Sequence, residues 1–189
     1  MPRPDRSRAA LIDAAAILFR RQGYAATGLN QILDEAGAKA GSLYHHFPGG
    51  KQELAAAVVE SAGAQIGQIL RGALAQDVPA AVVVERWLDM LAAGLAGDHR
   101  DGCPVEPIAT ESVHASELVR RAASQAFDSW SAALAGRLQA DGWEPDRADD
   151  TALAVLSLIE GALVLSRTKG DAAALNSAKT AARALLSAG

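Results

Sequence analysis

The stretch between two glycine breaks, at Gly23 and Gly50, most constrains how this chain can fold. Apolar residues at helical spacing predict a short helix over 28–36. A second short helix is predicted over 40–47, so that only three residues separate the two. A longer helix, predicted over 6–22, precedes both. Two short helices joined by a tight, glycine-containing turn after a supporting helix are typical of a helix-turn-helix.

Helical periodicity continues through the rest of the chain. Half of the residues are hydrophobic and only 4% are aromatic, and alanine and leucine, which both favour helices, dominate. No alternating pattern of useful length indicates a strand. Six further helices are predicted, over residues 51–74, 79–95, 105–112, 116–140, 146–168 and 171–187. The predicted fold class is therefore all-α, with an N-terminal three-helix helix-turn-helix domain over 1–50 and a C-terminal helical domain over 51–189.

The cysteine count and the lengths of the apolar runs narrow the class of protein. The single cysteine, Cys103, excludes an internal disulfide and with it a disulfide-stapled secreted scaffold. The N-terminal residues lack the apolar stretch typical of a signal peptide. The most apolar run, 152–159, is too short to span a bilayer. We therefore expect a cytoplasmic protein with no membrane partner.

Charge is distributed unevenly along the chain. The net charge of −4 at pH 7 by itself disfavours a nucleic-acid partner. Residues 1–53, however, hold seven basic and five acidic residues, whereas residues 54–189 hold 11 basic and 17 acidic residues. A mildly basic head on an acidic body indicates that the N-terminal part is the one that meets phosphate.

The residues of the predicted helix-turn-helix form a specific pattern. They read Gly23-Tyr24, Thr27, Ile32, Ala36-Gly37, Gly41-Ser42-Leu43-Tyr44-His45-His46-Phe47, Lys51 and Leu54. This pattern closely resembles the DNA-binding domain of TetR-family repressors, over about residues 8–58. The run Gly102-Cys103-Pro104-Val105 and the insertion over 47–51 are similar to a multidrug- and flavonoid-responsive subgroup of that family. The resemblance implies a homodimeric transcription regulator that binds palindromic, double-stranded operator DNA and senses a small molecule through its C-terminal domain.

Candidate DNA contacts lie on the recognition helix and at the ends of its neighbours. Gly41 lets the backbone approach a base pair, and Ser42 can bond to base edges or phosphate. Tyr44 offers a hydroxyl to phosphate. Lys51 and Thr27 lie at predicted helix N-termini, where free N–H groups and the helix dipole bind anions, and Thr27 is also expected to cap its helix. The full set is Thr27, Lys39, Ala40, Gly41, Ser42, Tyr44, His45 and Lys51.

The start of the recognition helix departs from the family pattern. Family members commonly have serine or threonine at its cap, where this chain has Lys39 or Ala40. A missing side-chain cap typically costs about 1 kcal/mol. Lysine also opposes the helix dipole unless a DNA phosphate lies nearby, which favours a role of Lys39 in DNA binding. The same departure fits an alternative, a dimeric interaction module that has lost DNA binding.

Three other residues raise the alternative of a helical metallo- or thiol enzyme. Glu111 and His114 form an E-x-x-H pair, but a di-iron site needs two such pairs and further glutamates. Cys103 with His114 suggests a thiol dyad, but no oriented third group or oxyanion hole accompanies it. His45 and His46 are adjacent and point about 100° apart on a helix, so they cannot chelate one metal. No catalytic residue, metal or cofactor is therefore expected.

Aromatic residues in the middle of the C-terminal domain mark a candidate effector pocket. Trp87 and Met90 share one helical face, and Phe127 and Trp130 share a face of another helix. Such stripes equally form plain core, and this alternative stays open. Few polar groups lie among them, so the expected effector is apolar or aromatic. The candidate lining is Trp87, Met90, Leu91, Cys103, Ile108, Phe127, Trp130, Leu158 and Gly161.

Two C-terminal helices, over about 147–168 and 171–187, are candidates for the dimer interface. The first is apolar nearly all round over 152–159 and must be covered on more than one side. The second has an apolar stripe through Ala178 and Ala182, whose small side chains allow close approach. We expect both helices to meet their copies across a twofold axis as a four-helix bundle, and glutamate at position 182 to break the dimer.

Overall fold

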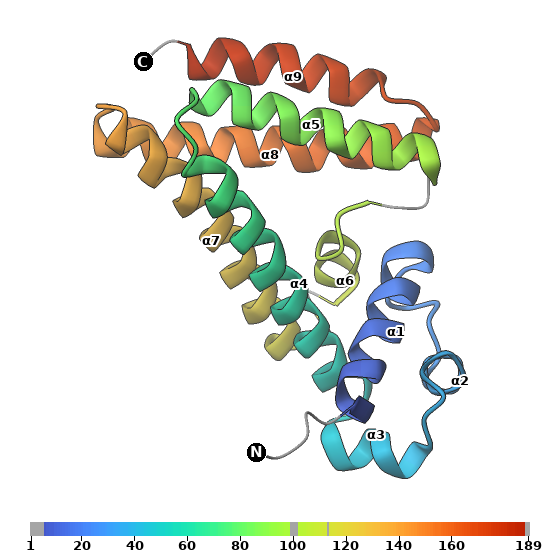
Figure 1. The fold of residues 1–189 in the computed structure, drawn as a ribbon. Helices are drawn as coiled ribbons and strands as arrows, with labels where there is room; N and C mark the ends of the chain where they lie inside the picture. Colours follow the sequence, from blue (N-terminus) through green and yellow to red (C-terminus); the bar gives the residue numbers. More distant parts are fainter. Residues whose placement is uncertain (1–5, 99–101, 113, 188–189) are drawn as a thin grey trace. The chain divides into compact units, whose positions relative to one another are not determined.

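The computed structural model describes residues 6–98, 102–112 and 114–187. These residues form nine α-helices and no strand (Figure 1). The helices are α1 (Arg6–Gln22), α2 (Leu29–Ala36), α3 (Ala40–His46), α4 (Lys51–Leu74), α5 (Ala80–Gly97), α6 (Glu106–Ser112), α7 (Glu117–Ala140), α8 (Pro145–Lys169) and α9 (Ala173–Leu186). The predicted all-α fold is therefore confirmed, and every helix begins and ends within two residues of its predicted position.

A left-handed glycine closes the turn between α2 and α3. Gly37 has a φ of 59°, a backbone conformation that glycine adopts without strain. The N–H of Ala38 donates to the carbonyl of Leu33 at 2.9 Å and so satisfies one of the helix-end carbonyls. The chain can therefore enter α3 after a very short connection, as the helix-turn-helix requires.

The N-terminus of α2 differs from the prediction. Its N-cap residue is Gly28, which has no side chain to cap the helix. Thr27 is only 1% exposed, and its hydroxyl donates to the carbonyl of Gly23 at 2.7 Å. The prediction that Thr27 caps α2 is therefore wrong, because its hydroxyl closes the turn that follows α1.

The first turn of α3 has no side-chain cap, as the sequence predicted. Lys39 is the N-cap residue, and its side chain makes no capping hydrogen bond to the described part of the chain. Burial holds the helix instead: Leu43 and Phe47 are fully buried, and α3 packs against α1. The apolar face of α3 therefore fixes which of its faces points outward.

The described residues of 1–64 and 104–126 form one compact unit. Within this unit α1 packs against α2, α3 and α6. Its core includes Leu11, Phe19 and Ile32, all of which are fully buried. The short helix α6 thus packs with the helix-turn-helix, although it lies far along the chain.

The described residues of 65–103 and 127–189 form the second compact unit. In it α9 lies alongside both α5 and α8 (Figure 1). Two ion pairs join α9 to α5. Arg183 binds Glu85, and the Nζ of Lys179 lies 2.5 Å from the Oδ1 of Asp89. None of the described helices is both long enough and apolar enough to cross a membrane.

The alanine stripe of α9 lies inside this second unit. Leu175, Ala178 and Ala182 are each at most 2% exposed. The expectation that this stripe meets a second copy, and that Ala182 reports on the dimer, is therefore wrong. Small side chains favour close approach within a protomer as well as between protomers, and here α9 packs against its own α5 and α8.

Packing does not divide the chain at residue 50. The first part of α4, all of α6 and the start of α7 share a unit with the helix-turn-helix. The boundary between 1–50 and 51–189, at the start of the helix that follows Gly50, stays a prediction.

Candidate nucleic-acid interface

The helix α3 has an exposed face opposite its buried one. Five of the predicted DNA-contacting residues are exposed on α3 or directly before it: Lys39, Ala40, Gly41, Tyr44 and His45. Tyr44 is 54% exposed, whereas the neighbouring Leu43 is fully buried. An ammonium, a phenol hydroxyl, an imidazole and bare backbone are groups that can bond to base edges and phosphate oxygens.

Ser42 is tied to the start of α1. It is half-buried, and its hydroxyl shares a hydrogen bond with the hydroxyl of Ser7. In this structure the side chain therefore joins α3 to α1. No signal in the sequence indicates this pairing, because 35 residues separate the two serines. A direct contact of Ser42 with a base stays a prediction.

Thr27 is also engaged within the unit. Besides its bond to Gly23, its hydroxyl accepts a hydrogen bond from the Nε2 of Gln22 at 3.1 Å. The buried hydroxyl is therefore used to shape the turn before α2. Any phosphate contact at this position would come from backbone N–H groups at the start of α2.

Lys51, the first residue of α4, lies against an aromatic ring. Its Nζ is 4.2 Å from the centroid of the Tyr24 ring, within the range of a cation–π interaction. Burial lowers the pKa of the Lys51 amine, and the nearby Glu111 carboxylate opposes that shift. Burial raises the pKa of the Tyr24 hydroxyl. The sequence pattern indicates Lys51, but no signal in it indicates the ring or the carboxylate beside it.

Tyr44 and the start of α4 lie close together. A Cβ on Gly50 would be 3.7 Å from a ring carbon of Tyr44, and Lys51 directly follows Gly50. The exposed face of α3 therefore continues to the N-terminus of α4. There the free N–H groups and the helix dipole favour an anion, and the lysine adds a positive charge.

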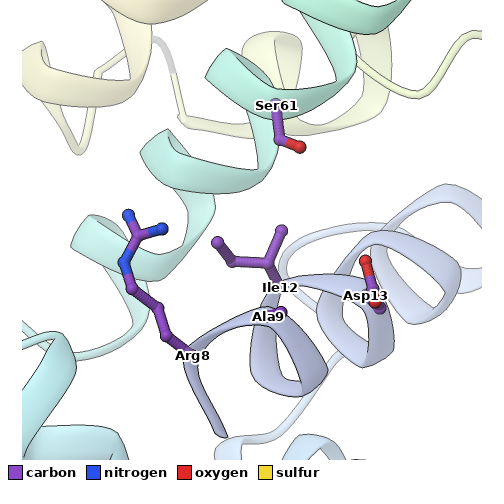
Figure 2. A pocket seen from close by; sticks show the side chains of 5 residues that line it. All are labelled: Arg8, Ala9, Ile12, Asp13 and Ser61. Carbon is purple, nitrogen blue, oxygen red and sulfur yellow. The ribbon is translucent and has the colours of Figure 1, made fainter. Parts of the chain in front are cut away.

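An open pocket of about 340 Å³ lies between α1 and α4 (Figure 2). It is lined by Arg8, Ala9, Ile12, Asp13 and Ser61. The polar side chains of Arg8, Asp13 and Ser61 are all exposed, so they give a ligand little to orient it. The guanidinium carbon of Arg8 lies 5.3 Å from the centroid of the Phe47 ring, which is fully buried. We therefore assign Arg8 to the support of α3.

In the second unit, two of the predicted effector-pocket residues contact each other. The rings of Phe127 and Trp130 are perpendicular, with centroids 5.4 Å apart. Trp130 is 4% exposed and Phe127 is half-buried. A Cβ on Gly67 of α4 would lie 3.5 Å from the Cδ1 of Trp130, an ordinary van der Waals distance, so α4 passes directly beside the indole.

The other predicted pocket residues lie in different settings. Three are half-buried: Trp87, Leu91 and Leu158. Met90 is 51% exposed, and Gly161 is exposed with no described atom within 4 Å of an added Cβ. Cys103 is buried in the second unit, whereas the fully buried Ile108 belongs to the first. The grouping of these residues around one effector stays a prediction.

The residues considered for a metallo- or thiol enzyme include Glu111 and Cys103, and their contacts differ from those of an active site. The Glu111 carboxylate accepts a hydrogen bond from the backbone N–H of Ala25, and Cys103 is buried. Within the described ranges, no three residues of the His, Cys, Asp and Glu types gather where they could hold a metal ion.

An exposed recognition helix on a packed three-helix head defines a helix-turn-helix DNA-binding regulator. Residues 11–58 match the family described as bacterial regulatory proteins of the tetR family, and residues 80–181 match the C-terminal domain of LmrA/YxaF-like transcriptional regulators. The chain belongs to the TetR family of transcriptional regulators. The predicted family is thereby confirmed, and the enzyme alternative is set aside because the relatives are regulators.

Individual relatives agree with this assignment. The transcriptional regulator LmrA of Bacillus subtilis is 36% identical over 163 residues, covering 86% of this chain and 87% of LmrA. The regulator YxaF of the same organism is 34% identical over 166 residues, which is 87% of each chain. Regulators of this family bind operator DNA and dimerise.

Solved structures share the fold. The TetR regulatory protein of Rhodobacter sphaeroides aligns over 95% of this chain and 98% of its own, with a TM-score of 0.83 and 24% identity. A TetR regulator of Legionella pneumophila aligns over 92% and 93%, with a TM-score of 0.82 and 22% identity. The predicted combination of an N-terminal helix-turn-helix with a C-terminal helical domain is thereby confirmed.

Proposed function

We propose that this regulator is a homodimeric repressor that binds a palindromic operator and leaves it when a small apolar or aromatic effector binds. The observation that carries the proposal is the exposed face of α3 continuing to Lys51 at the start of α4. In this arrangement α3 enters the major groove, while Lys51 and Tyr44 bind phosphate. The cytoplasmic location expected from the sequence is part of the proposal, since the partner is operator DNA.

The outer face of α8 supports a dimer through α8 and α9. Over 153–168, its exposed residues carry no charge: Leu153, Ala154, Ser157, Gly161, Val164, Leu165 and Thr168. Leu153 is 57% exposed and Leu165 is 51% exposed. Contiguous exposed apolar surface of this kind is typical of an interface. On the adjacent α9, Lys179 and Arg183 are already bound to carboxylates of α5.

The aromatic pair of α7 supports an apolar or aromatic effector. Phe127 is half-buried against Trp130, so a ligand beside it would meet an aromatic ring. A coupling of about 1–3 kcal/mol between effector and DNA sites would lower operator affinity roughly 5–150-fold. An aromatic effector should quench tryptophan fluorescence, and the quenching should fall when Trp130 is replaced by phenylalanine.

The test of DNA binding is a mobility shift with duplex DNA from the region flanking the protein's own gene. We expect Lys51→Ala to weaken binding and to lower the slope of log affinity against log salt concentration by about 0.9, the value of one phosphate contact. Tyr44→Phe should also weaken binding, through loss of its hydroxyl.

Arg86→Ala is the matched control for the loss of one positive charge. Arg86 is exposed on α5, away from the helix-turn-helix sequence. The Arg86→Ala variant should have the operator affinity and the salt slope of wild type. Wild-type affinity in a Tyr44→Phe/Lys51→Ala double variant would overturn the proposed interface.

A further inference from the structure

A carboxylate from α6 binds the turn that follows α1. The Oε2 of Glu111 accepts a hydrogen bond from the backbone N–H of Ala25 at 2.5 Å. Gly23 in the same turn has a φ of 89°, and a Cβ there would collide with the Glu111 carboxylate. An ionised acceptor makes a stronger hydrogen bond than a neutral one. The turn is therefore held closely by a side chain 86 residues further along the chain.

The held turn carries the ring that supports Lys51. Tyr24 directly precedes Ala25. The centroid of its ring lies 4.2 Å from the Nζ of Lys51 and 5.4 Å from the centroid of the Phe19 ring. Because Phe19 is fully buried, the Tyr24 ring is anchored to the core. Fixing Ala25 therefore also fixes the surface on which the ammonium group of Lys51 rests.

The segment after Glu111 touches the start of α4 as well. The Nε2 of Gln52, the residue after Lys51, donates to the carbonyl of Ala115 at 3.3 Å. The negative charge of Glu111 also acts on Lys51 directly and favours its charged form. All of these residues lie in the first compact unit. Glu111 and Ala115 thus contact, respectively, the turn that carries Tyr24 and the residue that follows Lys51.

We propose that Glu111 is a positioning residue for DNA binding: its carboxylate fixes the turn over 23–25 and thereby holds Lys51 where it can bind a phosphate. The inference rests on the proposed role of Lys51. Glu111 lies within the segment that matches the C-terminal domain family, yet its carboxylate serves the DNA-binding head. It contacts no DNA in this proposal and acts only through Tyr24 and Lys51.

Three substitutions separate the hydrogen bond from the charge. Glu111→Gln keeps an acceptor oxygen and loses the charge, so its operator affinity should stay within about threefold of wild type. Glu111→Ala loses both and should weaken binding about tenfold, with the salt slope falling by about 0.9 as one phosphate contact is lost. Glu111→Asp keeps the charge but withdraws the carboxylate by one methylene, and should behave like the alanine variant.

A double-mutant cycle with Lys51 provides the decisive measurement, on the full-length protein and the same flanking-DNA duplex. In the Lys51→Ala background, Glu111→Ala should cause no further loss of affinity and no further change of salt slope. Thermal melting of each variant checks that the fold is retained. If the alanine variant does not fold, Glu111→Asp takes its place in the cycle.

The outcomes distinguish the two proposals. If Lys51→Ala alone leaves affinity and salt slope at wild-type values, the proposed phosphate contact fails. If Lys51→Ala weakens binding but the Glu111 variants are silent, or their loss adds fully to that of Lys51→Ala, the positioning role of Glu111 is overturned.

Discussion

At the scale of single residues, Arg137 of α7 shows how one side chain completes the end of another helix. Its guanidinium donates to the carbonyls of Leu74, Gln76 and Val78, the last at 2.7 Å, and pairs with Asp141 at 3.0 Å. The last carbonyls of a helix have no partners within it. The arginine satisfies the last carbonyl of α4, that of Leu74, and two carbonyls in the connection that follows, and its side chain is only 18% exposed.

Replacing Arg137 with methionine keeps an apolar stem and removes all of these donors. We expect the free energy of unfolding to fall by about 2–3 kcal/mol, measured by urea denaturation, because partly buried carbonyls lose charged donors. Arg121→Met is the matched control on the same helix: that side chain is 71% exposed, and its loss should cost no more than about 0.5 kcal/mol. Equal losses in the two variants would contradict this account.

Single residues also mark a limit of sequence reasoning. Thr27 and Ser42 could be predicted to lie near helix starts, because local glycines and apolar spacing place those starts. The hydrogen-bond partners of their hydroxyls could not be predicted, since a threonine can equally well cap a helix, close a turn or bind a phosphate. In the structure the Thr27 hydroxyl donates to the carbonyl of Gly23, and the Ser42 hydroxyl shares a hydrogen bond with the hydroxyl of Ser7. The contact of Glu111 with Ala25 could not be predicted either, because 86 residues separate the two.

At the scale of helices, local signals were sufficient for boundaries but not for partners. Gly37 and Gly170 end α2 and α8 in the left-handed conformation, as glycines after a periodic segment predict. Periodicity also predicted the apolar stripe of α9 correctly. It could not tell whether α5 and α8 of the same chain or a second copy covers that stripe, because both would select small apolar residues.

The helices α4 and α7 lie close together at a glycine. A Cβ on Gly63 would lie 2.7 Å from the Cβ of Ala126, closer than side chains tolerate. Gly63→Ala should therefore destabilise the protein by about 1–3 kcal/mol, as overpacking does, and lower the midpoint of thermal unfolding. Unchanged or increased stability in this variant would show that the two helices can separate at no cost.

Gly72→Ala on the same helix supplies the control with the opposite sign. An added Cβ at Gly72 meets no described atom within 4 Å. Alanine there should stabilise the protein by about 0.4–1 kcal/mol, since it restricts the unfolded chain and favours the helix. The pair separates the packing effect at Gly63 from the general effect of replacing glycine in α4.

The first turn of α7 holds an acid-sensitive ion pair. Hydrogen bonds from Arg120 and Arg121 lower the pKa of Glu117 to about 2. The carboxylate thus binds its proton less readily in the folded than in the unfolded chain, where its pKa is about 4.3. Its contribution to stability is present above that value and is lost as the pH falls toward about 2.

Glu117→Gln should remove this part of the acid dependence. The difference in thermal midpoint between wild type and variant should shrink between about pH 4.3 and the folded-state value. Because the side chains of Glu117, Arg120 and Arg121 are largely exposed, added salt should also reduce the difference in thermal midpoint at neutral pH. A difference that stays constant over this pH range would rule out the ion pair as its source.

At the scale of the whole molecule, the proposed binding to a palindromic operator requires two protomers. A palindromic operator presents half-sites about 34–36 Å apart, and two recognition helices must meet them together. The uncharged outer face of α8 is the surface proposed to join the protomers. A substitution that breaks this contact should therefore weaken operator binding without touching α3, because each monomer would meet only one half-site.

Leu153→Glu tests this coupling between assembly and DNA binding. Leu153 is 57% exposed on α8, so glutamate is tolerated in a monomer but places a charge in the proposed interface. Sedimentation should give a dimer for wild type and a monomer for the variant at micromolar concentration, with operator affinity falling by more than tenfold.

Leu118→Glu is the matched control, since Leu118 is 50% exposed on α7, and this variant should remain dimeric. Ala182→Glu should instead lower the thermal midpoint, because Ala182 is fully buried within its own protomer. A Leu153→Glu protein that stays dimeric would place the interface elsewhere, and a monomer that binds the full operator as tightly as wild type would separate DNA binding from dimerisation.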